Sequence, residues 1–148
     1  MIRRATADDA GMIARAVAMA IGDEQTLRRY CGEEYLSVLQ EIAYADLTQY
    51  SWQSALIAEV DGVAAGAIVG YDGARLEELR ENTFAIIEHR VGTRPSIANE
   101  TEAGEYYLDS VGVLPDFRGM GLGRKLIVAL CDEAFRQGHE RVGLIVEQ

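Results

Sequence analysis

The sequence predicts a single α/β domain, because strand-like and helix-like patterns of apolar residues alternate along it. Three observations support this prediction. The chain has 148 residues, 49% hydrophobic and 26% charged, which fits one domain with a real core. The apolar patterns give the element order βααββαβαβ. Residues 106–146 have a strand–helix–strand pattern, which predicts a parallel βαβ unit within a sheet of mixed pairing.

The first third of the chain is expected to hold one strand and two helices. Residues 2–5 are a short extended segment, and the capping-box pattern of residues 6–9 begins a helix that ends at Gly22. Helical spacing defines the buried face of this helix: Met12, Ile13, Ala16, Val17, Ala20 and Ile21. A second helix is expected on a further set of apolar positions: Tyr35, Leu36, Val38, Leu39 and Ile42.

Two strands are expected next, over residues 54–60 and 63–71. The dipeptide Asp61-Gly62 between them favours a tight hairpin turn, because both of its residues tolerate positive φ. Gly66 and Gly70 lie inside the second strand, where a glycine either weakens the strand or marks a close approach of the backbone to another part of the chain.

The second half is expected to alternate between helices and strands. A helix over residues 74–88 is followed by a long polar loop. Strand 106–114 leads into a helix over residues 121–137, and residues 142–146 form the last strand. The chain has no internal repeat, so we expect one domain over residues 1–148.

Composition narrows the possible partners and ligands. Twenty-four acidic residues against fourteen Lys and Arg give a net charge of -10, which disfavours nucleic acid and anionic lipid and favours cationic small molecules. No apolar run is long enough to span a bilayer. Cys31 and Cys131 form no close pair, so we expect reduced thiols and a cytoplasmic protein. His89 and His139 have no partners at metal-ligand spacing, so no metal is expected.

The chemically most distinctive stretch is the turn between strand 106–114 and the helix that follows. Three alternating glycines allow close backbone approach to a ligand, and the helix start adds unpaired amides that favour a phosphate group. The glycines and the basic residues beside them are Gly119, Gly121, Gly123, Arg118, Arg124 and Lys125. A Walker loop requires Gly-Lys followed by Ser or Thr, which is absent, and the dinucleotide pattern G-x-G-x-x-G is not completed.

Residues 118–123, Arg-Gly-Met-Gly-Leu-Gly, resemble the acetyl-CoA signature of the GNAT superfamily of N-acetyltransferases. That signature is Gln or Arg, two residues, Gly, one residue, then Gly or Ala. The preceding residues 113–117, the opening residues 2–6 and the element order are also similar, so the resemblance covers nearly the whole chain. It implies a central sheet that is mixed but mostly antiparallel, flanked by helices, with the parallel βαβ unit at its C-terminal end.

The resemblance also implies a reaction in which acetyl-CoA is the cosubstrate and a primary amine of a small molecule or peptide attacks the thioester directly. The glycine-rich turn would hold the CoA pyrophosphate, and strand 106–114 would splay near a bulge to receive the pantetheine arm. An N–H of this strand would polarise the thioester carbonyl. The cosubstrate-binding residues implied are Val111, Val113, Arg118, Gly119, Met120, Gly121, Leu122, Gly123 and Arg124.

Asp109 and Tyr107 are the candidate catalytic residues. Family acids near the position of Asp109 often serve as a base through water, and the alternative is that Asp109 shapes the strand by hydrogen bonds to the backbone or Ser110. Tyr107 shares its strand face with Asp109 and either lines the pocket or packs in the core.

The end of the chain raises an alternative function. The resemblance implies a tyrosine acid on a helix after the last strand, and the sequence ends at Gln148 without the usual C-terminal helix and strand. Either another group or water supplies that proton, or the chain is a truncated acetyltransferase or a non-catalytic CoA-binding regulatory domain. An uncovered strand 142–146 would also favour a homodimer through that edge.

Residues 72–105 are expected to form an insertion where the resemblance implies a short turn. They hold four arginines and the following eight acids: Asp72, Glu77, Glu78, Glu81, Glu88, Glu100, Glu102 and Glu105. One hypothesis is a substrate lid whose negative field attracts a cationic amine. The alternative is a solvated helix with no such role.

Overall fold

The computed structural model describes residues 1–95 and 105–144. Five strands and five α-helices lie within these residues, together with short 3-10 turns. In chain order they are β1 (Ile2–Arg4), α1 (Ala10–Ile21), α2 (Glu24–Cys31), α3 (Tyr35–Tyr44), β2 (Ala55–Val60), β3 (Val63–Asp72), α4 (Leu76–Val91), β4 (Tyr106–Val113), α5 (Leu122–Arg136) and β5 (Val142–Leu144).

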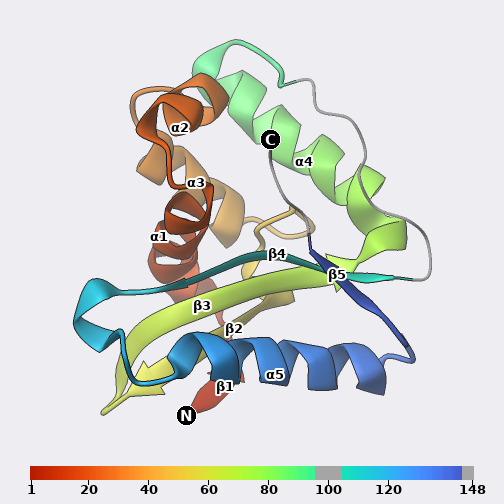
Figure 1. Ribbon diagram of the computed structural model, residues 1–148. Helices are drawn as coiled ribbons and strands as arrows, with labels where there is room; N and C mark the ends of the chain where they lie inside the picture. The colour runs from red at the N-terminus through yellow and green to blue at the C-terminus, as the bar shows by residue number, and fades with distance from the viewer. Residues whose placement is uncertain (96–104, 145–148) are drawn as a thin grey trace.

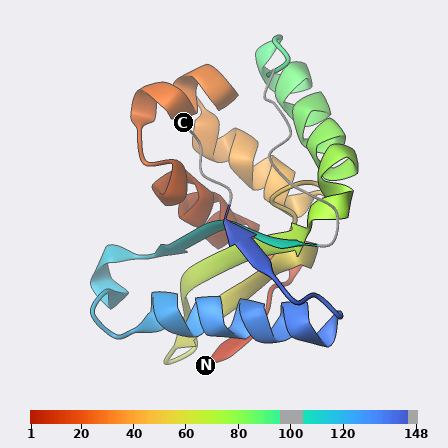
Figure 2. The same ribbon diagram turned by 45° about the vertical axis from the view of Figure 1, so that its right-hand side comes forward.

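The strands form one sheet in the order β1-β2-β3-β4-β5. The first four pair antiparallel, and β4 pairs parallel with β5. Helices α1–α4 lie on one side of the sheet and α5 lies on the other (Figures 1 and 2). The predicted mixed, mostly antiparallel sheet with a C-terminal parallel βαβ unit is therefore confirmed.

Two layers of apolar side chains hold the helices on the sheet. On the α1–α4 face, buried residues of the helices, such as Ile13 and Ile42, join Ile57 and Val69 of the strands in one cluster. On the opposite face, three leucines of α5 at positions 122, 126 and 130 pack against Ile68. Both faces of the sheet are thus covered by helices.

The predicted element order misses one helix, α2. Its mean hydropathy is low, because it has only two buried apolar positions, Leu27 and Cys31, one turn apart. A helix so short has too few apolar positions to stand out in a sequence window. Its start is fixed instead by Asp23, whose carboxylate accepts hydrogen bonds from the backbone N–H groups of Gln25 and Thr26.

The predicted capping pattern before α1 is confirmed, with a 3-10 turn over Ala7–Asp9 preceding the helix. The Asp9 carboxylate accepts a hydrogen bond from the backbone N–H of Thr6 (2.8 Å). It also pairs with the Arg3 guanidinium of β1 (2.7 Å), which lowers the pKa of Asp9. Gly22, with φ +80°, ends the helix as expected.

The predicted hairpin between β2 and β3 is confirmed. Asp61 and Gly62 have φ values of +50° and +79°. The close approaches predicted at two glycines of β3 are also confirmed. A Cβ at Gly66 would lie 2.9 Å from the carbonyl oxygen of Gly112, and one at Gly70 would lie 2.8 Å from Leu130 Cδ2.

Helix α4 corresponds to the helix predicted over residues 74–88. It docks on the body by an apolar side: Leu76, Leu79, Phe84 and Ile87 are buried. Arg90 of α4 pairs with Glu41 of α3 (2.7 Å), and Arg94 pairs with Glu81 and Glu88. These ion pairs offset part of the negative charge expected there. Glu100 and Glu102 lie outside the described residues.

Within the described residues, no helix is both long enough and apolar enough to cross a membrane. Neither cysteine forms a disulfide bond: Cys31 is buried in the core and Cys131 is half-buried on α5.

Candidate functional site

The glycine-rich turn forms an open cradle between β4 and α5. After β4, a 3-10 turn over Pro115–Phe117 leads into Gly119 and Gly121, whose φ values are +82° and +75°. A Cβ at either glycine would meet no atom within 4 Å, so the space beside them is open. The turn therefore needs glycine for its backbone conformation, and successive residues in such a conformation direct their N–H groups into one concavity.

The start of α5 adds further unpaired amides to this cradle. Within the described residues, the first backbone hydrogen bond of the helix runs from the N–H of Lys125 to the carbonyl oxygen of Gly121 (3.1 Å). The amides of Leu122, Gly123 and Arg124 precede it, and they lie at the positive end of the helix dipole. Leu122 is buried and anchors the turn to the core. This donor set fits a phosphate or pyrophosphate group.

Basic side chains surround the cradle. Arg118, Arg124 and Lys125 are exposed, as is Met120. The Arg118 guanidinium turns back and donates to the carbonyl oxygen of Val113 at the end of β4 (3.2 Å). An exposed cation beside open backbone amides strengthens the fit to an anion.

The predicted arm-binding residues lie on the face of β4 that is turned toward α5. Val111 and Val113 are half-buried and pack against the apolar cluster of α5. Gly112 between them faces α1, where a Cβ would lie 2.9 Å from Ala16 Cα. Within the described residues, β4 pairs with β5 through Tyr106, Tyr107 and Leu108. Residues 145 and 146 of the predicted last strand lie outside the described residues.

Strand β4 carries a bulge at Asp109. Val69 of β3 pairs with Ser110 and the next residue, Gly70, pairs with Leu108, so Asp109 is the extra residue. A bulge was expected in this strand, and its effect is to turn Asp109 and Ser110 together toward the α1–α4 side of the sheet.

The Asp109 carboxyl is held by side chains from three segments. Its Oδ2 accepts hydrogen bonds from Tyr71 Oη (2.7 Å) and Gln49 Nε2 (3.3 Å), and its Oδ1 accepts one from Ser110 Oγ (2.9 Å). Burial raises the pKa of Asp109 above its ordinary value, although these donors and the charge of Arg80 oppose the shift. A carboxyl with a raised pKa among polar side chains is a candidate proton acceptor.

Sequence reasoning missed Tyr71 and Gln49 as neighbours of Asp109. Gln49 lies in the loop between α3 and β2, sixty residues before Asp109. Only the strand register could have indicated Tyr71, which lies opposite Tyr107 in the β3–β4 pair. Their proximity depends on the loop path and the bulge, which have no local sequence signature.

Tyr107 lies on the same sheet face as Asp109, as predicted. It is buried and packs in a small cluster with Tyr71, Leu76 and Leu79. This surrounding favours the alternative of a core tyrosine, and a catalytic role for Tyr107 stays a prediction.

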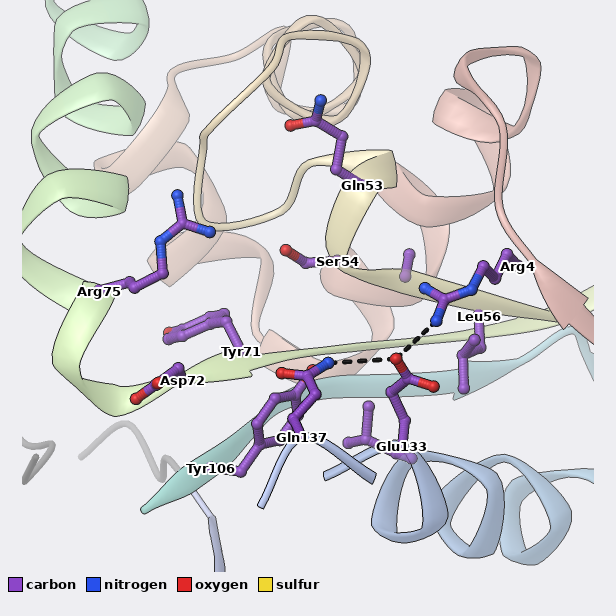
Figure 3. A pocket seen from close by; sticks show the side chains of 12 residues that line it. Arg4, Gln53, Ser54, Leu56, Tyr71, Asp72, Arg75, Tyr106, Glu133 and Gln137 are labelled. Carbon is purple, nitrogen blue, oxygen red and sulfur yellow. Dashed lines mark hydrogen bonds and ion pairs between the residues drawn. The ribbon is translucent and has the colours of Figure 1, made fainter. Parts of the chain in front are cut away.

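A separate polar cavity lies toward the C-terminal end of α5 (Figure 3). Glu133 at its floor pairs with Arg4 of β1 (2.6 Å) and accepts a hydrogen bond from Gln137 (3.1 Å). Its volume is about 140 Å³, well below the roughly 300–1,000 Å³ of ligand pockets. This cavity is therefore too small for a nucleotide-sized ligand, and the open cradle is the stronger candidate.

Neither histidine contacts the cradle within the described residues. His89 is exposed on α4. His139 packs edge-on against Tyr106 and lies 3.2 Å from Asp72 at the end of β3. Among residues 1–95 and 105–144, no three potential metal-ligating side chains gather in one place.

Comparison with solved structures identifies similar folds. A crystal structure of an acetyltransferase is 32% identical, with a TM-score of 0.80 over 99% of this chain and 80% of that one. An N-acetyltransferase from Staphylococcus aureus Mu50 is 25% identical, with a TM-score of 0.77 over 90% of this chain and 75% of that one. A GNAT family acetyltransferase from Brucella melitensis, solved with acetyl-CoA, shares the fold at 21% identity and a TM-score of 0.55, over 100% and 76% of the two chains.

A search of curated proteins gives no match. The family model described as the acetyltransferase (GNAT) family matches residues 24–148, which include the cradle, the β4 bulge and all of α5. The chain therefore belongs to the GNAT family of acetyltransferases.

Proposed function

We propose that this protein transfers the acetyl group of acetyl-CoA to a primary amine of a small molecule or peptide, by direct attack of the amine on the thioester. The observation that carries the proposal is that one strand, β4, leads from the Asp109 bulge to the glycine cradle. The open, basic glycine cradle follows the end of β4, and the Asp109 carboxyl lies at the bulge inside β4. Asp109 and Val113 are four residues apart, roughly 13 Å along an extended strand, so an extended arm held at the cradle reaches the bulge.

The cradle residues hold the pyrophosphate of CoA in this proposal. The amides of residues 119–124 donate to the phosphate oxygens, and Arg118 and Arg124 supply positive charge. Val111 and Val113 line the path of the pantetheine arm along β4. The acetyl-CoA-bound Brucella melitensis relative supports this use of the shared fold.

Asp109 acts as the base in this proposal. An amine that attacks a carbonyl must lose a proton, and the cosubstrate supplies only the activated acetyl group. The raised pKa of Asp109 makes its carboxylate a better proton acceptor than an ordinary aspartate, and a water molecule can connect the two. A backbone N–H of β4 near the bulge stabilises the negative charge that develops on the carbonyl oxygen.

Two measurements test the activity. Thermal unfolding with CoA, acetyl-CoA, NAD and ATP identifies the ligand, since a ligand at 100 times its Kd adds about 2.7 kcal/mol of stability. Thiol release from acetyl-CoA is then followed with butylamine, spermidine and a lysine-containing peptide. Stabilisation by CoA without amine-dependent thiol release would contradict the transferase and leave the CoA-binding regulatory domain.

The role of Asp109 is tested by Asp109→Asn. The amide keeps the size of the side chain but cannot accept the amine proton, so the rate should fall about 10²- to 10⁴-fold. The affinity for acetyl-CoA should be nearly unchanged, because the cradle is untouched. Asp132→Asn, at an exposed position of α5, is the matched control. Transfer by Asp109→Asn at the parent rate would exclude Asp109 as the base.

A further inference from the structure

The hydrogen bonds of the Asp109 carboxyl are divided unequally between its two oxygens. Within the described residues, Oδ2 accepts from both Tyr71 Oη (2.7 Å) and Gln49 Nε2 (3.3 Å). Oδ1 accepts only from Ser110 Oγ (2.9 Å), its neighbour on the same strand. A carboxylate oxygen has about two acceptor sites, so Oδ2 is filled and Oδ1 keeps one open.

Tyr71 is suited to be a permanent donor. Burial and the negative charge of Asp109 raise the pKa of Tyr71 far above that of a free phenol. The hydroxyl therefore keeps its proton at any working pH, and its 2.7 Å bond to the carboxylate is short and charge-assisted. The same property makes Tyr71 a poor acid for the thiolate that leaves during transfer.

Gln49 is held from the other side by α4. Its backbone N–H donates to Thr83 Oγ1 (2.8 Å), and the Thr83 hydroxyl donates to the carbonyl oxygen of Leu79 (2.9 Å). The Gln49 side chain is itself buried, so its amide has little freedom. Because a carboxylate only accepts hydrogen bonds, the amide must present its NH₂ group to Asp109.

We propose that Tyr71 and Gln49 are positioning residues of the transfer reaction, which fix the Asp109 carboxyl through Oδ2 so that Oδ1 receives the proton of the attacking amine. This inference rests on the role of Asp109 given under the proposed function. The groups that face the carboxyl are Tyr71 from β3, Gln49 from the α3–β2 loop, Ser110 from β4 and the cationic Arg80 from α4. All four favour its ionised form and oppose the effect of burial.

Removing either donor should make Asp109 hold its proton more tightly. Both donors stabilise the carboxylate, so Tyr71→Phe and Gln49→Met should move the Asp109 titration to higher pH. Both substitutions keep the approximate volume of the side chain and the backbone bond from Gln49 to Thr83. The matched control is Tyr106→Phe, because Tyr106 is also buried and its hydroxyl donates to the carbonyl oxygen of Gly70 (3.1 Å) without touching Asp109.

The first measurement is the pH titration of the Asp109 ¹³Cγ resonance by NMR, which needs no substrate. The titration should move upward in Tyr71→Phe and Gln49→Met and stay at the parent position in Tyr106→Phe. Thermal unfolding of all three variants reports any general loss of stability. An Asp109 titration that is the same in all variants overturns the positioning role, whether or not the protein is a transferase.

The second measurement is the pH profile of kcat/KM with whichever of butylamine, spermidine or the lysine-containing peptide is turned over fastest. On the acid side of the profile, kcat/KM should fall over the pH range in which the NMR titration shows Asp109 taking up its proton. At a fixed pH on that side, kcat/KM of Tyr71→Phe should be about tenfold lower than that of the parent protein. KM for acetyl-CoA should not change, because the cradle is intact. A titration that moves while the acid limb stays would overturn Asp109 as the base, and the positioning role with it, although acetyl transfer itself persists.

Discussion

At the scale of single residues, the cradle depends on a conformation that only glycine adopts easily. Gly121→Asp should abolish CoA binding, because the side chain fills the open space beside the amides and adds a negative charge at the proposed pyrophosphate site. The fold should survive, since a Cβ at this position meets no other atom within 4 Å. Calorimetric titration with CoA is the measurement.

Gly138→Asp is the matched control for this prediction. Gly138 also has a positive φ, +91°, and open space around it, and it follows the opposite end of the same helix. The backbone strain and the added charge are therefore similar in the two variants. Gly121→Asp with CoA affinity equal to that of Gly138→Asp would mean that the pyrophosphate binds elsewhere.

Asp109 also couples proton binding to folding. Burial raises the pKa of this carboxyl above its unfolded value, so folding favours the protonated form. The contribution of Asp109 to stability is complete at pH values below its pKa in the unfolded chain. It is lost as the pH rises through the pKa of Asp109 in the folded protein. The Asp109 site therefore makes the protein less stable at neutral pH than at mildly acidic pH.

We expect Asp109→Asn to remove this pH dependence. Its Tm should equal or exceed that of the parent protein at pH 7, and the advantage should shrink as the pH falls toward 4. Asp9 has the opposite effect on the pH dependence of stability, because the Arg3 guanidinium lowers the pKa of Asp9. Asp9→Asn should therefore lower the stability at pH 7. Parallel Tm–pH curves for the parent and Asp109→Asn would contradict the coupling.

At the scale of elements, the sequence predicts what local patterns encode. The period-two strands, the long amphipathic helix α5 and the Asp61-Gly62 turn each carry their signal within a few residues. Helix α2 does not, because its stability comes from the Asp23 cap and two buried side chains. The cap is a local signal, but the burial of Leu27 and Cys31 depends on tertiary packing, which a window of sequence does not contain.

The site divides in the same way. The cradle is a continuous stretch of chain, so its conformation and basic flanks could be predicted from residues 118–125 alone. The hydrogen bonds around Asp109 join Gln49, Tyr71 and Ser110 from three separate segments. No spacing rule links such residues, so only the assembled sheet and its bulge reveal them.

Alanine substitutions at two glycines, one in β3 and one in α1, should change the free energy of unfolding in opposite directions. At Gly70 in β3 a Cβ would lie 2.8 Å from Leu130 Cδ2 and 2.9 Å from the carbonyl oxygen of Tyr107, so Gly70→Ala should cost about 1–3 kcal/mol. At Gly11 in α1 a Cβ would make only ordinary contacts with Gln40 at 3.9 Å, so Gly11→Ala should add about 0.5–1 kcal/mol. Urea unfolding measures both, and a stabilising Gly70→Ala would mean that β3 and α5 pack less closely.

At the scale of the whole molecule, the net charge of -10 should favour cationic acceptors. Three arginines of the α4 region pair with acids: Arg75, Arg90 and Arg94. The negative electrostatic field therefore comes from the molecule as a whole more than from α4. Raising salt from low to physiological concentration should raise the apparent KM for spermidine and leave that for an amine of zero net charge unchanged. Equal salt responses for the two amines would contradict electrostatic attraction.

The two sides of β4 have a consequence for the order of events in a catalytic cycle. Val111 and Val113 face α5, whereas Asp109 faces the helices of the opposite layer. With the proposed roles, the thioester and the amine approach the bulge from different faces of a single strand. Neither reactant then blocks the path of the other, so a complex of three components can assemble in either sequence without a covalent enzyme form between two half-reactions.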